Sequence, residues 1–204
     1  MTSYSLSQIR RQIKYLKRDK DDFKTLFWIF LDDSNISNIE VFLKILPGKS
    51  FFGLIIRGKS KKIIYSRAKR ISKLCKRKKV PYYIYDYSDI ALITAAGGVH
   101  YSSRVKQQKK YKNLKISCSF HGKRDIRRVK YLLPDLIFIS PVFRTTSDKQ
   151  KKPLALQLLN LYINNLKYNI AALGGIDLKN IRKLRNRNIS CVGGVSIVRK
   201  IIDY

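Results

Sequence analysis

Residues 169–176 read Asn-Ile-Ala-Ala-Leu-Gly-Gly-Ile, and residues 191–198 read Cys-Val-Gly-Gly-Val-Ser-Ile-Val. In each stretch a short apolar run leads into a pair of glycines, and a pattern typical of a helix follows. Glycine lets the backbone turn sharply and come close to a ligand. A helix behind such a turn directs free N–H groups and the positive end of its dipole at an anion. Two such turns on consecutive strands match the phosphate site that a (β/α)8 barrel builds after its seventh and eighth strands.

The rest of the chain alternates predicted strands with predicted helices, without a linker or a low-complexity stretch. Strand-like apolar runs occupy residues 25–31, 51–56, 82–85, 98–101, 114–119, 136–140, 169–173 and 190–195. Several are continuously apolar, as strands buried on both faces of a parallel sheet are. Helical spacing covers residues 36–45, 62–75, 104–110, 124–133, 154–166 and 178–184, with a short helix over 88–94.

Eight such units in 204 residues favour an α/β fold that closes as a (β/α)8 TIM barrel over an open doubly wound sheet. One further helix, over residues 5–18, precedes the first strand, and Ser5 or Ser7 is its expected N-cap. We therefore divide the chain into an N-terminal basic helix region, residues 1–24, and a barrel domain, residues 25–204.

Composition indicates a globular protein with a real core, because 45% of the residues are hydrophobic. No apolar run approaches the length of a membrane span, and the N-terminus lacks the apolar core of a secretion signal. Cys75, Cys118 and Cys191 are widely spaced in apolar surroundings, as buried thiols are. We expect a cytoplasmic protein without membrane insertion.

The net charge of +31 has two explanations. A strongly basic field attracts nucleic acid without sequence preference. Alternatively, lysine and arginine simply cover solvated helix faces. The basic residues are dispersed over helical and loop segments and are not interleaved with aromatic residues in an RNA-reading pattern. We therefore do not expect nucleic acid to be the main partner.

In a barrel of this kind the chemistry takes place at the C-terminal ends of the strands. Both histidines of the chain, His100 and His121, fall at the ends of neighbouring predicted strands, which favours a functional role. Asp32 and Asp33 follow the first strand and are expected to cap the next helix.

Six motifs in chain order resemble the thiamine phosphate synthase/TenI-like family over almost the whole chain. They read IIRGK (55–59), YIYDYSDIALITAAGGVH (83–100), SCSFH (117–121), DLIFISPVFRTTSDK (135–149), AALGGI (171–176) and GGVSIVRKI (193–201). The family has Q-x-R-x-K, N-D, G-V-H, S-x-H, G-P-V-F-x-T, I-G-G-I and G-V-A-V-x-S after its successive strands. No single motif is specific for the family, but the six motifs together, in this order and each at a predicted strand end, are specific for it.

The resemblance implies an enzyme that joins hydroxymethylpyrimidine diphosphate to thiazole phosphate and releases pyrophosphate, with Mg²⁺ as its cofactor. By the same resemblance, Arg57 and Lys59 face the diphosphate, Asp86 is a Mg²⁺ ligand, Ser119 contacts the pyrimidine and His121 is the S-x-H histidine. The thiazole phosphate falls to residues of the last three strand ends, which are Thr145, Thr146, Ser147, Lys149, Gly174, Gly175, Gly194, Val198 and Arg199.

The chain departs from the family pattern at its diphosphate end. Ile55 and Tyr85 replace the family's glutamine and asparagine, and Ser140 replaces a glycine. The second metal aspartate has no counterpart in the run Tyr101-Ser102-Ser103-Arg104-Val105, which should weaken metal binding. The motifs resemble most a divergent branch of the family of the kind seen in alphaproteobacteria, which reads S-P-V-F-P-T.

Three other functions stay open on the sequence. A TenI-like thiazole tautomerase needs acid–base groups, and of the two histidines of that branch only His121 is present, since Pro141 stands at the other position. A barrel that binds a phosphorylated ligand without catalysis would keep the phosphate contacts and lose the metal. A basic protein associated with RNA or a membrane surface would bind in a salt-dependent way. The sequence does not predict an oligomeric state.

Overall fold

Eight parallel strands close into a barrel in chain order, each paired with the next and β8 paired with β1. The computed structural model describes residues 6–14, 16, 27–33, 36–45, 51–106, 108–145 and 152–195. The strands are β1 (Phe27–Leu31), β2 (Phe52–Ile56), β3 (Tyr82–Tyr85), β4 (Gly98–Tyr101), β5 (Lys115–Phe120), β6 (Leu136–Ile139), β7 (Asn169–Leu173) and β8 (Cys191–Gly194). The predicted (β/α)8 TIM barrel is confirmed.

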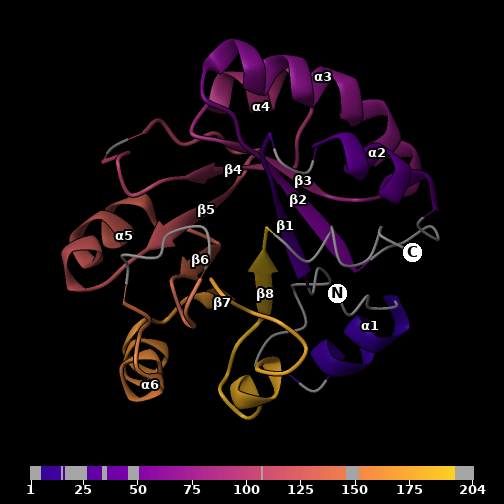
Figure 1. Ribbon diagram of the computed structural model, residues 1–204. Helices are drawn as coiled ribbons and strands as arrows, with labels where there is room; N and C mark the ends of the chain where they lie inside the picture. The colour runs from indigo at the N-terminus through magenta and orange to yellow at the C-terminus, as the bar shows by residue number, and fades with distance from the viewer. Residues whose placement is uncertain are drawn as a thin grey trace.

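Helices surround the strands on the outside of the barrel (Figure 1). They are α1 (Leu6–Lys14), α2 (Ile36–Ile45), α3 (Lys61–Lys78), α4 (Ser88–Ile93), α5 (Ile126–Leu132) and α6 (Leu156–Asn165), with the 3-10 turns η1 (Lys123–Asp125) and η2 (Ile181–Leu184). Within the described ranges, no helix is both long and apolar enough to cross a lipid bilayer.

Two predicted helices are wrong. Residues 104–106 and 108–110 are not helical, because Val105 is the only apolar side chain of the segment and no stripe can dock it on the barrel. The predicted helix over 178–184 shrinks to the single 3-10 turn η2. There the Asp177 carboxylate accepts hydrogen bonds from the N–H groups of Lys179 and Asn180, both 2.8 Å away. Such side-chain bonds compete with a regular helix start.

Aromatic rings fill the interior of the barrel. Trp28 packs against Tyr83 with ring centroids 4.6 Å apart, and Phe30 packs against Phe138 at 5.2 Å. Small residues on neighbouring strands make the room. A Cβ added to Gly98 would lie 2.9 Å from the Tyr83 ring, and one added to Gly193 would lie 3.2 Å from the Phe138 ring. Side chains therefore fill the interior of the barrel below the strand ends.

Helix α1 packs on the outer side of the barrel. Ile13 is fully buried, and Arg185 Nη2 donates a hydrogen bond of 3.3 Å to Gln12 Oε1. Ser7 lies within the helix and is exposed, so it is not the N-cap. Ser5 lies outside the described residues.

Candidate active site at the barrel mouth

The predicted site residues that the structure describes lie at the C-terminal end of the barrel. Arg57 follows β2, Asp86 follows β3, and Ser119 and His121 lie at the end of β5. Gly174 and Gly175 follow β7, and Gly194 ends β8. Because all eight strands are parallel, these ends meet on one side. Thr145 follows β6, whereas Thr146, Ser147, Lys149, Val198 and Arg199 lie outside the described residues.

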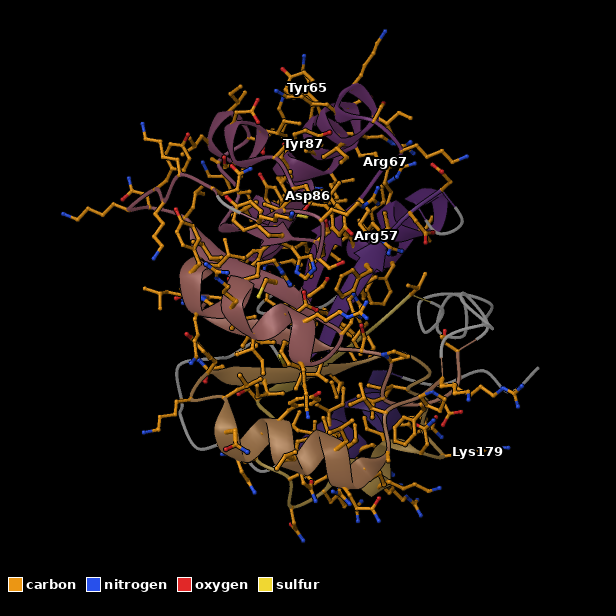
Figure 2. All side chains as sticks on the ribbon, turned by 90° about the vertical axis from the view of Figure 1, so that its left-hand side faces the viewer. Arg57, Tyr65, Arg67, Asp86, Tyr87 and Lys179 are labelled. Atoms are coloured by element: carbon orange, nitrogen blue, oxygen red, sulfur yellow. The ribbon has the colours of Figure 1, made fainter. Side chains whose placement is uncertain are left out.

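Arg57 is a cation at the mouth of the barrel. Its Nη2 forms an ion pair of 2.8 Å with Asp32 Oδ2, and its guanidinium lies 5.4 Å from the centroid of the Phe30 ring. Its Nε is buried without a hydrogen-bond partner. Figure 2 shows Arg57 and Asp86 in the same part of the molecule and Lys179 well away from both. Lys59, two residues later, is exposed.

Asp32 and Asp33 are ion-pair partners of arginines from neighbouring elements. Asp33 pairs with Arg67 of α3, and the same guanidinium donates to the Arg57 carbonyl oxygen. Asp32 therefore holds the side chain of Arg57, and Arg67 holds its backbone. The predicted capping role of the two aspartates for α2 stays a prediction.

Asp86 is held by one neighbour. Its Oδ1 accepts a hydrogen bond of 2.6 Å from the Ser102 N–H, and its Oδ2 accepts one of 2.8 Å from Ser102 Oγ. Its backbone has φ 61°, a left-handed conformation in which aspartate is more frequent than most residues. Burial raises the pKa of this carboxyl above 3.8, while the hydrogen bonds from Ser102 and the charge of Arg104 oppose the shift.

The described side chains do not fit a Mg²⁺ ion. Mg²⁺ requires near-octahedral oxygen ligands and commonly takes one or two carboxylates together with substrate phosphates. Asp86 is the carboxylate at this position, its oxygens accept hydrogen bonds from Ser102, and residues 102–114 of the following loop contain no second carboxylate. Arg104 lies near enough to lower the pKa of Asp86, so its guanidinium would repel a cation there. Across the described part of the chain, no three His, Cys, Asp or Glu side chains are grouped as metal ligands.

His100 is a buried, neutral histidine at the base of the mouth. Burial lowers its pKa from 6.5 to about 3. Its Nδ1 lies 2.9 Å from Ser117 Oγ and its Nε2 lies 3.0 Å from Ser119 Oγ, and its ring stacks on Tyr85. Ser117 Oγ donates to the Val99 carbonyl oxygen, which favours the tautomer with the proton on Nδ1. In that arrangement Ser119 donates to His100, and its oxygen can accept a hydrogen bond from a ligand.

His121 lies one strand end further on and is exposed. Its Nδ1 is 2.8 Å from the Ser140 carbonyl oxygen, so the Nδ1–H donates to that acceptor. The Nε2 atom then carries the lone pair of the neutral ring. His121 is therefore oriented as a proton acceptor through Nε2.

A buried ion pair that the sequence analysis missed links these strand ends. Arg128 of α5 and Asp125 are joined at 3.1 Å between Nε and Oδ1. Arg128 Nη1 donates to the Ser102 carbonyl oxygen at 3.1 Å, and its Nη2 donates to the Ser119 carbonyl oxygen. Asp125 Oδ2 accepts from the His121 N–H at 2.7 Å. In the sequence, Arg128 differs from the exposed Arg127 beside it only in the side of the helix on which it lies.

The glycine turns lie side by side as predicted, because Leu173 of β7 is level with Gly193 of β8. Gly174 and Gly175 have φ of 92° and 64°. A Cβ on Gly174 would lie 2.8 Å from Pro141 Cα, and one on Gly175 would lie 2.7 Å from the Phe143 carbonyl oxygen. The pair is thus required by close contact with the loop after β6. The helix expected behind it is only η2, whose Asn180 side chain donates to the Gly175 carbonyl oxygen at 2.6 Å.

Comparison with known proteins identifies the family. The thiamine monophosphate synthase family matches residues 31–201. A thiamine-phosphate synthase of Campylobacter jejuni strain RM1221 is 31% identical over 146 residues, 68% of this chain and 66% of that protein. One from Prochlorococcus marinus subsp. pastoris is 33% identical over 131 residues, 62% of this chain and 37% of that protein. The chain thus spans less than two thirds of the length of these relatives.

Solved structures agree on the fold. Thiamine phosphate pyrophosphorylase from Pyrococcus furiosus superposes with a TM-score of 0.67 at 17% identity, covering 87% of this chain and 92% of that one. The protein of that name from Bacteroides thetaiotaomicron gives a TM-score of 0.57 at 16% identity, covering 85% of this chain and 83% of that one. With the family match extending over most of the barrel, the chain belongs to the thiamine monophosphate synthase family.

Proposed function

We propose that this protein is a thiamine-phosphate synthase, a transferase that condenses hydroxymethylpyrimidine diphosphate with thiazole phosphate. The observation that carries the proposal is the family match over residues 31–201, which takes in the strand ends where Arg57, Asp86, Ser119 and His121 gather. The activity and both substrates are proposed from relatives of that name.

The reaction is a substitution at the pyrimidine methylene carbon. Its C–O bond breaks and the electron pair leaves with the diphosphate, after which the thiazole nitrogen supplies the pair for the new C–N bond. The protein's part is to position both substrates and to stabilise the departing charge. Arg57 and Lys59 are assigned to the diphosphate. The contacts of Asp32 and Arg67 support this role, because they fix Arg57 before substrate arrives.

The pyrimidine is assigned to Ser119 and His121. The buried, neutral His100 accepts a hydrogen bond from the Ser119 hydroxyl, so the serine oxygen is left to accept one from an N–H donor of the pyrimidine. The exposed ring of His121 lies at the next strand end.

The thiazole phosphate is assigned to the loops after β6, β7 and β8. The residues proposed for it are Thr145, Thr146, Ser147, Lys149, Gly174, Gly175, Gly194, Val198 and Arg199. The adjacent ends of β7 and β8 support the assignment, since backbone N–H groups there can point at one anion.

A turnover assay with both precursors tests the proposal. We expect pyrophosphate and thiamine phosphate to form in equal amounts, and neither to form when one precursor is omitted. Complementation of a thiamine auxotroph gives a second readout. Absence of turnover with both precursors, for a folded protein that complements no auxotroph, would reject the synthase.

A thiazole tautomerase is a second candidate, favoured by the orientation of His121. The hydrogen bond from its Nδ1 to Ser140 leaves Nε2 as a base. This activity would appear as isomerisation of the thiazole precursor without a pyrimidine substrate, abolished in His121→Ala.

A further inference from the structure

We propose that the mouth of this barrel binds the diphosphate through side-chain cations without a divalent metal ion, and that Asp86 is a positioning residue for the loop after β4. This inference rests on the proposed function for the identity of the diphosphate. It concerns the residues at the ends of β2 to β5, all of which the structure describes.

The first observation is how Asp86 uses its two oxygens. Each accepts a hydrogen bond from Ser102, one from the N–H and one from the hydroxyl. Ser102 Oγ in turn lies 3.4 Å from the Arg104 N–H, which donates to it. Asp86 therefore shapes the turn of residues 102–104, and residues 102–114 of the loop after β4 contain no second carboxylate that could help it hold a metal ion.

The second observation is the charge around this turn. Arg57 follows Ile56 of β2, which is level with Ile84 of β3, so it lies at the strand end next to that of Asp86. The Arg104 N–H donates to Ser102 Oγ, which itself donates to Asp86, so Arg104 belongs to the same turn. Both charges also act to lower the pKa of the Tyr85 hydroxyl. A guanidinium offers two parallel N–H donors to phosphate oxygens. Side-chain cations thus stand where the resemblance places a metal ion.

The third observation is that Ser102 connects Asp86 to the rest of the mouth. The Ser102 carbonyl oxygen accepts from Arg128, which also binds the Ser119 carbonyl oxygen and Asp125. Asp125 in turn accepts from the His121 N–H. A change at Asp86 is therefore passed to Ser119 and His121 through Ser102 and Arg128, which is a positioning effect.

The test measures binding of inorganic pyrophosphate by isothermal titration calorimetry, in EDTA and separately with Mn²⁺ as a magnetic probe for Mg²⁺. We expect saturable pyrophosphate binding in EDTA and no protein-bound Mn²⁺ in electron paramagnetic resonance titrations. Arg57→Gln and Arg104→Gln should each weaken pyrophosphate about tenfold or more. Arg127→Gln, an equal charge change on the exposed face of α5, should leave the affinity within about twofold.

Asp86→Asn separates the two roles of Asp86. A metal ligand predicts loss of pyrophosphate binding in this variant. The positioning role predicts that pyrophosphate binds as tightly or more tightly, because a negative charge is removed while one acceptor remains. We expect Ser102→Ala and Asp86→Ala to have the same kinetic effect, a decrease in kcat that is larger than the increase in KM. Asp86→Asn should have a higher kcat than Asp86→Ala.

Two outcomes overturn the inference. One is pyrophosphate binding that requires Mn²⁺ or Mg²⁺ and disappears in Asp86→Asn. The other is no pyrophosphate binding under either condition. Turnover abolished by EDTA and restored by Mg²⁺ would confirm the synthase and reject the metal-free site. Metal-free pyrophosphate binding without turnover would support the site and reject the synthase.

Discussion

Arg57 shows how neighbouring elements prepare one side chain for an anion. Asp32 pairs with its Nη2, Arg67 binds its carbonyl oxygen, and the Phe30 ring lies under its guanidinium. A guanidinium that is fixed before the substrate arrives loses little conformational entropy on binding. Its charge is also already in place when the leaving group develops negative charge, which is the electrostatic preorganisation that such reactions need.

Substitution of Arg57 tests that role in turnover. We expect Arg57→Gln to lower kcat/KM for pyrophosphate release by about 10²–10³-fold, the usual effect of removing one preorganised donor. The exposed Arg70, which pairs with Glu40 away from the mouth, gives the matched control Arg70→Gln with unchanged kcat/KM. Equal kinetics in the two variants would contradict the assignment of Arg57 to the diphosphate.

His100 gives the protein a stability change with pH. Its folded pKa of about 3 lies below the unfolded value of 6.5, so below pH 6.5 the unfolded chain binds a proton that the folded chain does not. Stability contributed by the neutral ring is therefore complete above pH 6.5 and is lost at about 1.4 kcal/mol per pH unit as the pH falls toward the folded pKa.

Denaturant titrations of wild type and His100→Gln between pH 7 and the acid range measure this loss. The free energy of unfolding should fall more steeply with acid for wild type than for the variant. Parallel pH profiles would show that His100 does not stay neutral in the folded state.

At the scale of elements, the loops after β6 and β7 depend on each other. Gly175 has a left-handed backbone, and an added Cβ would meet the carbonyl groups of the β6 loop. We expect Gly175→Ala to reduce the free energy of unfolding by about 2–4 kcal/mol, since it adds backbone strain to a clash with fixed backbone atoms. Thermal or urea unfolding measures the effect.

Gly97 provides the control for this substitution. Its φ is not positive, it is exposed, and an added Cβ would come no closer than 3.7 Å to another group. Gly97→Ala should change stability by less than about 1 kcal/mol. If both variants unfold alike, the contact between the two loops is not what requires glycine at residue 175.

Helix α5 contributes to the mouth through Arg128. Replacing Arg128 by Met leaves the buried Asp125 without its ion-pair partner, and the carbonyl groups of Ser102 and Ser119 lose their donor. We expect a loss of about 3–5 kcal/mol, the usual cost of breaking a buried ion pair by removing one partner. Arg127→Met on the exposed side of the helix should stay within about 0.5 kcal/mol in the same unfolding assay. A small effect of Arg128→Met would mean that water replaces its contacts.

At the scale of the whole molecule, the net charge is +31, and helix α3 shows where part of it lies. On α3, Lys62, Lys69, Lys73 and Lys76 are all exposed, on the side away from the barrel. We expect any affinity for oligonucleotides to be independent of sequence and to fall about a thousandfold between low and physiological salt. Fluorescence anisotropy with two scrambled oligonucleotides over a salt series measures this. Affinity that differs between the two sequences or survives physiological salt would indicate a dedicated nucleic-acid site.

The sequence by itself determined the eight strands, their order and the strand ends that carry Arg57, Asp86, Ser119 and His121. It could do so because apolar runs and helical spacing are local patterns, and parallel strands bring their ends to one side. The sequence-based prediction of a helix over residues 104–110 was wrong, because this polar segment has no apolar face that could pack against the barrel.

Only the tertiary structure decided how the site residues are partnered. Asp86 with Ser102, Arg57 with Asp32, and Arg128 with the carbonyls of two strand ends are contacts between residues far apart in the chain. The same holds for Gly175, whose requirement for glycine comes from the loop after β6. Such pairings depend on which strands are neighbours in the sheet, because each of them joins the ends of two adjacent parallel strands.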